Sequence, residues 1–172
     1  MPNCELTLAR REELDAVMAI LHNGRLFQRQ QGFVQWDDTH PTREAVEEDI
    51  RSGNGYAIRV AGDLAGYLCL SFDGDPAYPK IRGAWRFDGA YAVVHRLAIG
   101  EKHRGRGLTG EVFRLAGRLA KARGVDILRI DTHEDNLRMR HVLEKNGFLG
   151  CGTVVQNGGE RLAFDVLVAA HL

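Results

Sequence analysis

One stretch near the middle of the chain, residues 91–132, constrains the fold more than any other. An apolar run at 91–99 leads into a loop rich in arginine and glycine, and apolar residues then recur at helical spacing across 108–123. A second apolar run at 125–132 follows Gly124, a residue that commonly ends a helix. This order predicts two parallel strands joined by a right-handed helical crossover.

The loop between the first strand and the helix has the composition of a phosphate-binding site. Gly105 and Gly107 lack a Cβ atom, so the backbone can turn sharply enough for several N–H groups to converge on one anion. The start of the next helix adds unpaired N–H groups and the positive end of its dipole. The cationic side chains around the loop are Lys102, His103, Arg104 and Arg106. The alternative is a solvated, positively charged surface turn.

A Walker A loop, the first familiar phosphate-binding motif, does not fit these residues. That motif ends in Gly-Lys followed by Ser or Thr, so that the lysine reaches the phosphates and the hydroxyl holds magnesium. Here Gly107 is followed by Leu108 and Thr109. The missing lysine excludes this interpretation.

The dinucleotide-binding fingerprint fits the letters of the loop but not its context. Gly105, Gly107 and Gly110 reproduce the Gly-x-Gly-x-x-Gly spacing, and Asp131 closes the next strand at about the distance of a ribose contact. In that fold the chain turns at the first glycine almost as the strand ends, whereas five residues separate Ile99 from Gly105 here. Too little chain follows Asp131 for the second half of such a site. A dinucleotide-binding protein is kept as a minor alternative.

Downstream of this unit, residues 136–148 read Asn-Leu-Arg-Met-Arg-His-Val-Leu-Glu-Lys-Asn-Gly-Phe. This segment resembles the Asn-x-x-small-x-x-x-Tyr-Glu-Lys-x-Gly-Phe motif of the Gcn5-related N-acetyltransferases, the GNAT family. That family also has an upstream Arg/Gln-x-x-Gly-x-Gly/Ala loop, which residues 104–109 resemble in sequence, order and spacing. The two motifs lie within about residues 91–150 and are far more specific together than either is alone.

Three positions depart from the family's pattern. Thr109 stands where glycine or alanine is usual, and Met139 stands where a small residue is usual. Leu143 stands where the family often has a tyrosine that protonates the departing thiolate. The source of that proton is left open between water, a tyrosine from elsewhere such as Tyr91, and no residue at all. A thiol pKa around 8.5 makes an acid helpful without making it obligatory.

The resemblance implies an α/β fold, which some schemes class as α+β. It is the single-domain acyl-CoA N-acyltransferase fold over residues 1–172, with a mixed, mostly antiparallel sheet, a central parallel strand pair and helices on both faces. Periodicity and turn signals predict the other elements in the same order. They are a strand at 4–9, a helix at about 11–30, a helix after Pro41-Thr42, strands at 56–60 and 64–72, a long loop at 73–89, a helix at 136–146, and strands at 148–155 and 161–168.

The resemblance further implies an enzyme that transfers an acetyl group from acetyl-CoA, its cosubstrate, by direct attack of a primary amine of a small molecule or peptide. The residues it assigns to acetyl-CoA are Arg104, Gly105, Arg106, Gly107, Leu108 and Thr109 around the pyrophosphate, the strand backbone at Leu97 and Ile99 along the pantetheine arm, and Asn136 and Met139 on the other side of that arm. Asn136 is equally suited to cap its helix, and the two roles do not exclude one another.

The acceptor amine must lose a proton before it attacks, because its reference pKa near 10 keeps it protonated at neutral pH. His95 lies within the first strand, and Asp131 and His133 lie at the end of the second, so these side chains are the candidate catalytic residues. We favour His95 as the base, because an unperturbed histidine pKa near 6.5 suits proton transfer at neutral pH. The alternatives are that His95 is a packed, hydrogen-bonded strand residue and that Asp131 only orients a neighbouring group.

Aromatic residues in two irregular segments are the candidates for the acceptor site. Trp36 precedes the second helix and Trp85 lies in the long loop, each beside acidic side chains. Ring faces and carboxylates suit a cationic amine. The alternative is that both tryptophans fix loops to the core. A competing function, favoured by Leu143 and by the unsettled base, is a non-catalytic module that binds acyl-CoA as a sensor.

Charge and composition exclude some classes of partner. The 23 basic and 23 acidic residues cancel, which argues against a broad nucleic-acid surface. No long apolar run suggests a signal peptide or a membrane span, so we expect a cytoplasmic protein without membrane contact. Three widely spaced cysteines suit neither a disulfide framework nor a metal site. A homodimer is compatible with the sequence, which does not decide the oligomeric state.

Overall fold

The computed structural model describes residues 3–168, and its centre is one eight-stranded sheet in the order β1-β2-β3-β5-β6-β8-β7-β4. The strands are β1 (Cys4–Leu8), β2 (Gly55–Val60), β3 (Asp63–Ser71), β4 (Arg82–Gly83), β5 (Tyr91–Ile99), β6 (Ile127–Thr132), β7 (Leu149–Gln156) and β8 (Gly159–Leu167). The β5–β6 pair is parallel and the other pairs are antiparallel. The predicted mixed sheet with a central parallel pair is confirmed.

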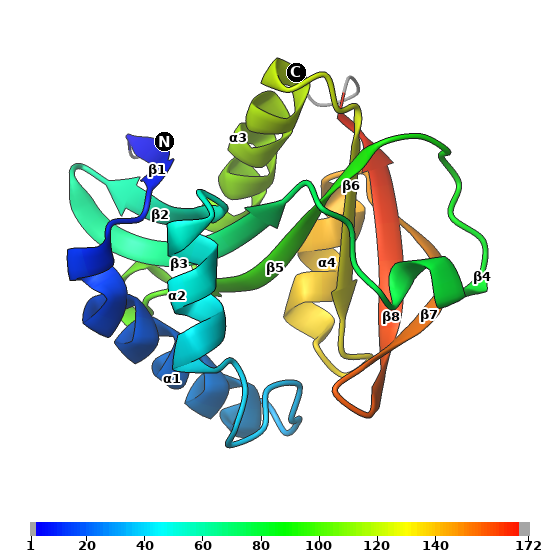
Figure 1. Cartoon of the computed structure of the whole chain (residues 1–172). Helices are drawn as coiled ribbons and strands as arrows, with labels where there is room; N and C mark the ends of the chain where they lie inside the picture. Colours follow the sequence, from blue (N-terminus) through cyan, green and yellow to red (C-terminus); the bar gives the residue numbers. More distant parts are fainter. Residues whose placement is uncertain (1–2, 169–172) are drawn as a thin grey trace.

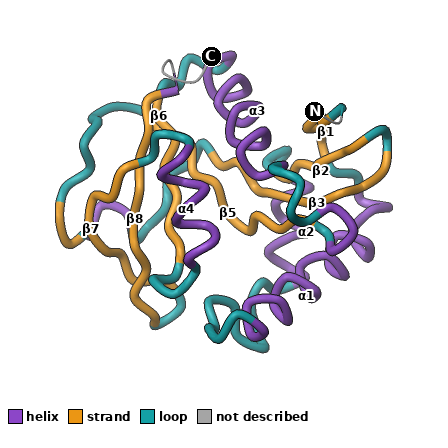
Figure 2. The backbone as a smooth tube through the Cα atoms, turned by 180° about the vertical axis from the view of Figure 1, so that it is seen from behind, coloured by secondary structure: helices purple, strands orange, loops and turns teal. Residues whose placement is uncertain are grey.

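Helices cover both faces of the sheet, as predicted. They are α1 (Leu14–Gln30), α2 (Arg43–Arg51), α3 (Leu108–Ala122) and α4 (Leu137–Lys145), with short 3₁₀ turns η1 (Arg11–Glu13), η2 (Tyr78–Lys80) and η3 (Glu101–His103). Figure 1 shows α1 and α2 in front of the strands, and the view from behind in Figure 2 brings α4 to the front.

Alternation along the strands explains this layering. On β5, Val94 joins the core cluster under α3 and α4, whereas Val93 faces the opposite side. Val17 of α1 and Val46 of α2 pack in a second cluster on that opposite side. The segment before β5 covers the rest of the same side, where Tyr78 is fully buried. The α1–α2 side of the sheet is therefore covered by two separate units.

The long loop predicted at 73–89 contains two elements that periodicity did not reveal. Besides η2, it forms the two-residue strand β4, which pairs with β7. Gly83 and Gly152 allow this pairing, because a Cβ atom on Gly83 would lie 2.2 Å from the Cys151 carbonyl oxygen, and one on Gly152 would lie 1.9 Å from the Arg82 carbonyl oxygen. Two residues are too few to show an alternating pattern in a sequence.

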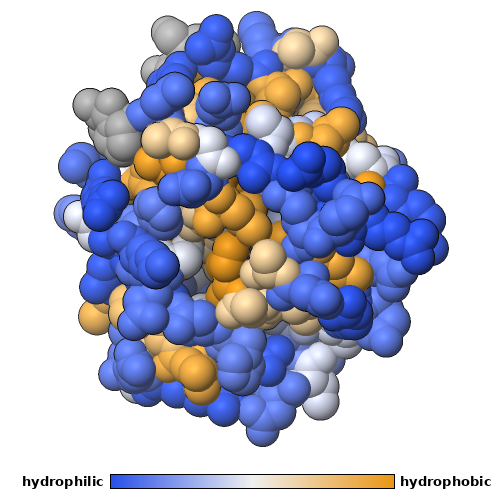
Figure 3. Space-filling model, turned by 90° about the vertical axis from the view of Figure 1, so that its left-hand side faces the viewer, coloured by the Kyte–Doolittle hydropathy of each residue, from blue (hydrophilic) through white to orange (hydrophobic). Residues whose placement is uncertain are grey.

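The face of the molecule on the left-hand side of Figure 1 is mostly polar. Figure 3, which views the molecule from the left-hand side of Figure 1, shows hydrophilic side chains around a central band of apolar ones. Within residues 3–168, no helix has the length and apolar character needed to cross a membrane.

Candidate active site

The two central strands separate because β5 is distorted at Arg96. Parallel pairing joins residues 91–93 to residues 127–129 and ends there. Arg96 has a φ of 52° and the register with β3 shifts beside it, so β5 bends away from β6 (Figure 1). Its guanidinium donates hydrogen bonds of 2.7 and 2.6 Å to the carboxylate of Asp49 in α2, and Tyr67 donates another of 2.9 Å. This largely buried network supports the bulge.

A cavity of about 560 Å³ opens on the α3 side of the separated strands, and we call it the β5–α3 cleft. The predicted cofactor residues that line it are Leu97, Ile99, Arg104, Gly105, Gly107, Leu108, Thr109, Asn136 and Met139. Arg106 is exposed and does not line the cleft. Because β5 pairs with β6 only as far as residue 93, the end of β5 can pair with an extended ligand in the manner of an added strand.

The loop before α3 has the backbone geometry of an anion site. Gly105 and Gly107 have φ values of 76° and 72°, in the left-handed region that favours glycine, and a Cβ atom on either would have no neighbour within 4 Å. Gly107 is the N-cap residue of α3, and no side chain caps the first N–H groups of this helix. These N–H groups are therefore available to a phosphate.

Two arginines stack on one aromatic ring beside this loop. The guanidinium carbon of Arg104 lies 4.0 Å from the ring centre of Phe27 in α1, and that of Arg138 in α4 lies 5.2 Å from it. Arg104 also donates a hydrogen bond of 2.5 Å to Asn23. Phe27 thus holds two cationic side chains at the rim of the β5–α3 cleft.

Asn136 has one of the two roles considered for it, that of a helix cap. Its side-chain oxygen accepts a hydrogen bond of 3.2 Å from the backbone N–H of Met139, which caps α4. Its amide nitrogen donates to the hydroxyl of Thr132 at 3.2 Å. These bonds fix its orientation where the β5–α3 cleft meets a second cavity.

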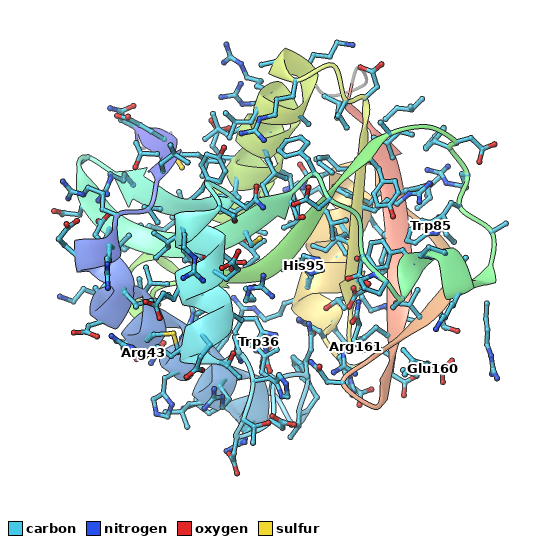
Figure 4. All side chains as sticks on the ribbon, viewed as in Figure 1. Trp36, Arg43, Trp85, His95, Glu160 and Arg161 are labelled. Atoms are coloured by element: carbon cyan, nitrogen blue, oxygen red, sulfur yellow. The ribbon has the colours of Figure 1, made fainter. Side chains whose placement is uncertain are left out.

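The second cavity, of about 450 Å³, lies on the opposite side of the separated strands, between α2 and the β7–β8 hairpin; we call it the β5–α2 cleft. Its lining includes Trp36, His95, Asp131 and Arg161. Figure 4 shows Trp36, His95 and Arg161 around the gap between α2 and β8. The carboxylates that line it are Glu48, Asp49, Asp73, Asp75 and Asp131.

His95 lies in this cleft beside a carboxylate from the long loop. Its Nε2 atom lies 3.4 Å from Oδ2 of Asp75, which also accepts a hydrogen bond of 2.9 Å from Gln156. Burial, together with the charge of Arg96, lowers the pKa of His95 from its usual value near 6.5. The imidazole is therefore neutral at physiological pH, but it is a weaker base than the unperturbed histidine expected from the sequence.

Asp131 faces the same cleft from β6. One of its carboxylate oxygens accepts hydrogen bonds of 2.8 Å from the hydroxyl of Tyr78 and 3.4 Å from Gln156. Burial, aided by the neighbouring charge of Asp75, raises the pKa of Asp131 to about 6 against the lowering effect of these hydrogen bonds. Asp131 is thus a carboxylate that changes charge near neutral pH.

His133 and Trp85, two other predicted site residues, lie outside both clefts. The Nδ1 atom of His133 accepts a hydrogen bond of 3.0 Å from the backbone N–H of Asp135, and its ring stacks on Phe33 with centroids 5.3 Å apart. Trp85 lies on the far side of β8 in Figure 4. It donates a hydrogen bond of 2.9 Å to the carbonyl of Tyr78 and covers the buried guanidinium of Arg129. Trp85 therefore fixes the loop, which is the alternative considered for it.

Neither Leu143, which stands where the family often has a tyrosine, nor Tyr91 supplies an acid for the thiolate to either cleft. Leu143 is fully buried in the core. Tyr91 lines neither cleft and stacks on Tyr78 with ring centroids 6.2 Å apart.

Within residues 3–168, no group of three His, Cys, Asp or Glu side chains is arranged to hold a metal ion.

Sequence reasoning missed Asp75, Gln156 and Arg161 as cleft residues. Asp75 lies in an irregular loop, and the other two flank a hairpin turn, so none belongs to a recognisable motif. The alternation along β8, which places Arg161 on the same face as Ala163, is the one signal that could have pointed to Arg161.

Comparison with known proteins identifies the architecture. The sequence model described as the acetyltransferase (GNAT) family matches residues 21–148. A GNAT-family acetyltransferase from Streptococcus agalactiae is 32% identical, with a TM-score of 0.86 over 95% of each chain. The aminoglycoside acetyltransferase AAC(6')-Ib, solved with coenzyme A and kanamycin, is 20% identical, with a TM-score of 0.71 over 98% of this chain and 96% of that one. No curated protein matches the sequence.

Proposed function

We propose that this chain, which belongs to the GNAT family of acetyltransferases, transfers the acetyl group of acetyl-CoA directly to a primary amine of a small molecule or peptide. One observation carries the proposal. The β5–α3 and β5–α2 clefts, on opposite sides of the separated strands, share Gln28, Trp36, Leu97, Asn136 and Met139 in their linings. Two ligands can therefore enter from opposite sides and meet beside β5.

The β5–α3 cleft suits acetyl-CoA, which supplies an acyl group activated as a thioester. The loop at Gly105 and Gly107 and the uncapped start of α3 hold the pyrophosphate through backbone N–H groups. Arg104 adds positive charge from the rim, while Leu97 and Ile99 offer the free backbone of β5 to the amide groups of the pantetheine arm. With acetyl-CoA bound in this way, its thioester would lie where the strands separate.

The β5–α2 cleft suits the acceptor amine. Asp131 and Asp75 favour binding of the ammonium form, and His95 accepts the proton that the ammonium group loses before it attacks. Asp75 beside Nε2 favours the tautomer with hydrogen on that nitrogen, which leaves the lone pair on Nδ1 as the base. The C–N bond forms as the C–S bond breaks, and the second proton that leaves the nitrogen passes through water to the thiolate. Water takes this role because Leu143 stands where the family often has a tyrosine.

The structure of AAC(6')-Ib holds coenzyme A together with kanamycin, an aminoglycoside and therefore an amine-bearing molecule. An acceptor that carries a cationic amine agrees with that complex, with which this chain shares its fold. The acidic side chains of the β5–α2 cleft support the same class.

The proposal is tested by measuring release of free CoA from acetyl-CoA in the presence of polyamines, amino acids, aminoglycosides or peptide N-termini. We expect release to depend on at least one amine and to yield its N-acetyl product. If acetyl-CoA binds tightly but no amine is acetylated, the chain is the non-catalytic acyl-CoA sensor instead. Competition between NAD and CoA for binding would restore the dinucleotide interpretation.

A further inference from the structure

One buried cation in the β5–α2 cleft has no anionic partner. Arg161 of β8 is 7% exposed and lines this cleft. One terminal nitrogen donates a hydrogen bond of 3.1 Å to the carbonyl of Glu160, and the other donates one of 2.8 Å to the carbonyl of Gln35. In the part of the chain that the structure describes, no carboxylate forms an ion pair with it.

Two other arginines, the half-buried Arg96 and the buried Arg129, differ from Arg161 in a way that points to a ligand. Arg96, which lines the same cleft, is held bidentately by Asp49. Arg129 is stacked on the rings of Trp85 and Tyr91 and lines neither cleft. Arg161 combines a cleft position with a guanidinium that forms no ion pair within residues 3–168.

A guanidinium in this setting is a receptor for an anion. It has five N–H donors, and the two carbonyl contacts engage only part of this set and fix its orientation. Burial lowers the pKa of Arg161, which reflects the cost of a charge removed from water. A bound carboxylate would offset this cost, because its two oxygens match the planar fork of the guanidinium.

Strand register places Arg161 near the amine site. Asp131 pairs with Ala163, and Arg161 lies two residues from Ala163 on the same face of β8. Such diagonal neighbours are about 7–8 Å apart, within reach of a long side chain. The negative charges of Asp131 and Asp37 also act on Arg161, although neither carboxylate forms an ion pair with it. A negative and a positive anchor thus lie a short distance apart along one wall of the cleft.

We infer that the acceptor is a zwitterion, an α-amino acid or a similarly short amino carboxylate, whose carboxylate binds Arg161 while its amine lies against Asp131 and His95. This inference rests on the proposed acetyl transfer and narrows its substrate. Arg161 is a specificity-determining residue on this account, and it takes no part in the proton transfer.

The test compares each amino acid with its own amide, which keeps the amine and side chain but lacks the negative charge. For the unchanged enzyme, we expect kcat/KM for the acid to exceed that for the amide by about 30-fold or more, the range of a charge-assisted hydrogen bond pair. Equal values for acid and amide, or a preference for polyamines, would overturn the inference while leaving acetyl transfer established. Absence of transfer to every amine would instead contradict the proposed function.

Two variants separate anion binding from a structural role. Arg161→Gln should raise KM for the amino acid by about 10-fold or more and change the values for the amide by less than about threefold. Arg161→Lys keeps the charge without the fork and should recover part of the loss. Arg118→Gln removes an exposed arginine of α3 and is the matched control, expected to behave as the unchanged enzyme. Equal losses for acid and amide in both Arg161 variants would contradict the inference.

Discussion

The Nε2 atom of His95 in β5 lies 3.4 Å from Oδ2 of Asp75, a residue of the loop that follows β3. This contact joins β5 to the unit that covers the C-terminal half of the sheet. Asp75 is itself held in place, because it accepts hydrogen bonds of 2.7 Å from the backbone N–H of Ala77 and 2.9 Å from Gln156. The loop therefore orients the imidazole from one side of the β5–α2 cleft.

Replacement of the imidazole should slow the reaction without affecting acetyl-CoA. We expect His95→Gln to lower kcat by about 100-fold, the usual size of a general-base effect, with an unchanged dissociation constant for acetyl-CoA. The affinity is preserved because His95 does not line the β5–α3 cleft. Steady-state kinetics and calorimetry measure the two quantities. A kcat within about threefold of the unchanged enzyme, with the fold intact, would assign His95 to the core and favour a water chain as base.

The pH profile should report Asp131 rather than His95. With its pKa raised to about 6, Asp131 gains its negative charge as the pH rises through that value, so kcat/KM for the amine should rise there. The lowered pKa of His95 places its own titration at more acidic pH. Asp131→Asn should remove the rise near pH 6, whereas a rise that persists in this variant and vanishes in His95→Gln would reverse the two assignments.

Asp131 should also make the folded state less stable at neutral pH. Its pKa is raised from 3.8 to about 6 on folding, so its favourable contribution is present below 3.8 and is lost as the pH rises through about 6. Two pKa units correspond to about 3 kcal/mol. When the pH is raised from 4 to 7, the free energy of unfolding of Asp131→Asn should therefore increase relative to that of the unchanged protein by up to about 3 kcal/mol. Urea unfolding at both pH values measures this gain, and an equal difference at both would contradict the assignment.

The anion loop can be tested at a single glycine. Gly107→Val should weaken CoA binding by at least about 10-fold, because a branched side chain resists a φ of 72° and would distort the loop whose N–H groups are proposed to bind the phosphate. Gly62→Val is the matched control, since Gly62 has a φ of 86°, has equally open surroundings and lies in the β2–β3 turn outside both clefts. Calorimetry should show weaker binding for the first variant alone. Equal affinities of the two variants for CoA would show that the loop does not bind CoA.

The fold and the β5–α3 cleft could be predicted because their signals are local. The strand, loop and helix around Gly107 follow one another in the sequence, and Asn136 begins the next helix in a motif of fixed spacing. The β5–α2 cleft could not be predicted to the same depth. The contact between Asp75 and His95 joins an irregular loop to a strand, and no spacing rule relates the two.

The distortion of β5 is a second feature that could not be predicted from the sequence. Arg96 has a φ of 52°, a conformation that disfavours arginine, and it is kept there by Asp49, which lies 47 residues earlier in the chain. The bulge depends on this long-range pair and leaves no mark in the strand's own sequence. The position of Trp85 likewise depends on a long-range contact, because its ring covers the buried guanidinium of Arg129.

In the proposed reaction, acetyl-CoA passes its acetyl group directly to an amine where the two clefts meet. The most direct measurement is mass spectrometry of the protein and the products after incubation with isotopically labelled acetyl-CoA and the amine panel. We predict a labelled N-acetyl product in an amount equal to the CoA released, with no label on the protein at any time. A labelled protein that passes its acetyl group on, or CoA release without an N-acetyl product, would contradict it.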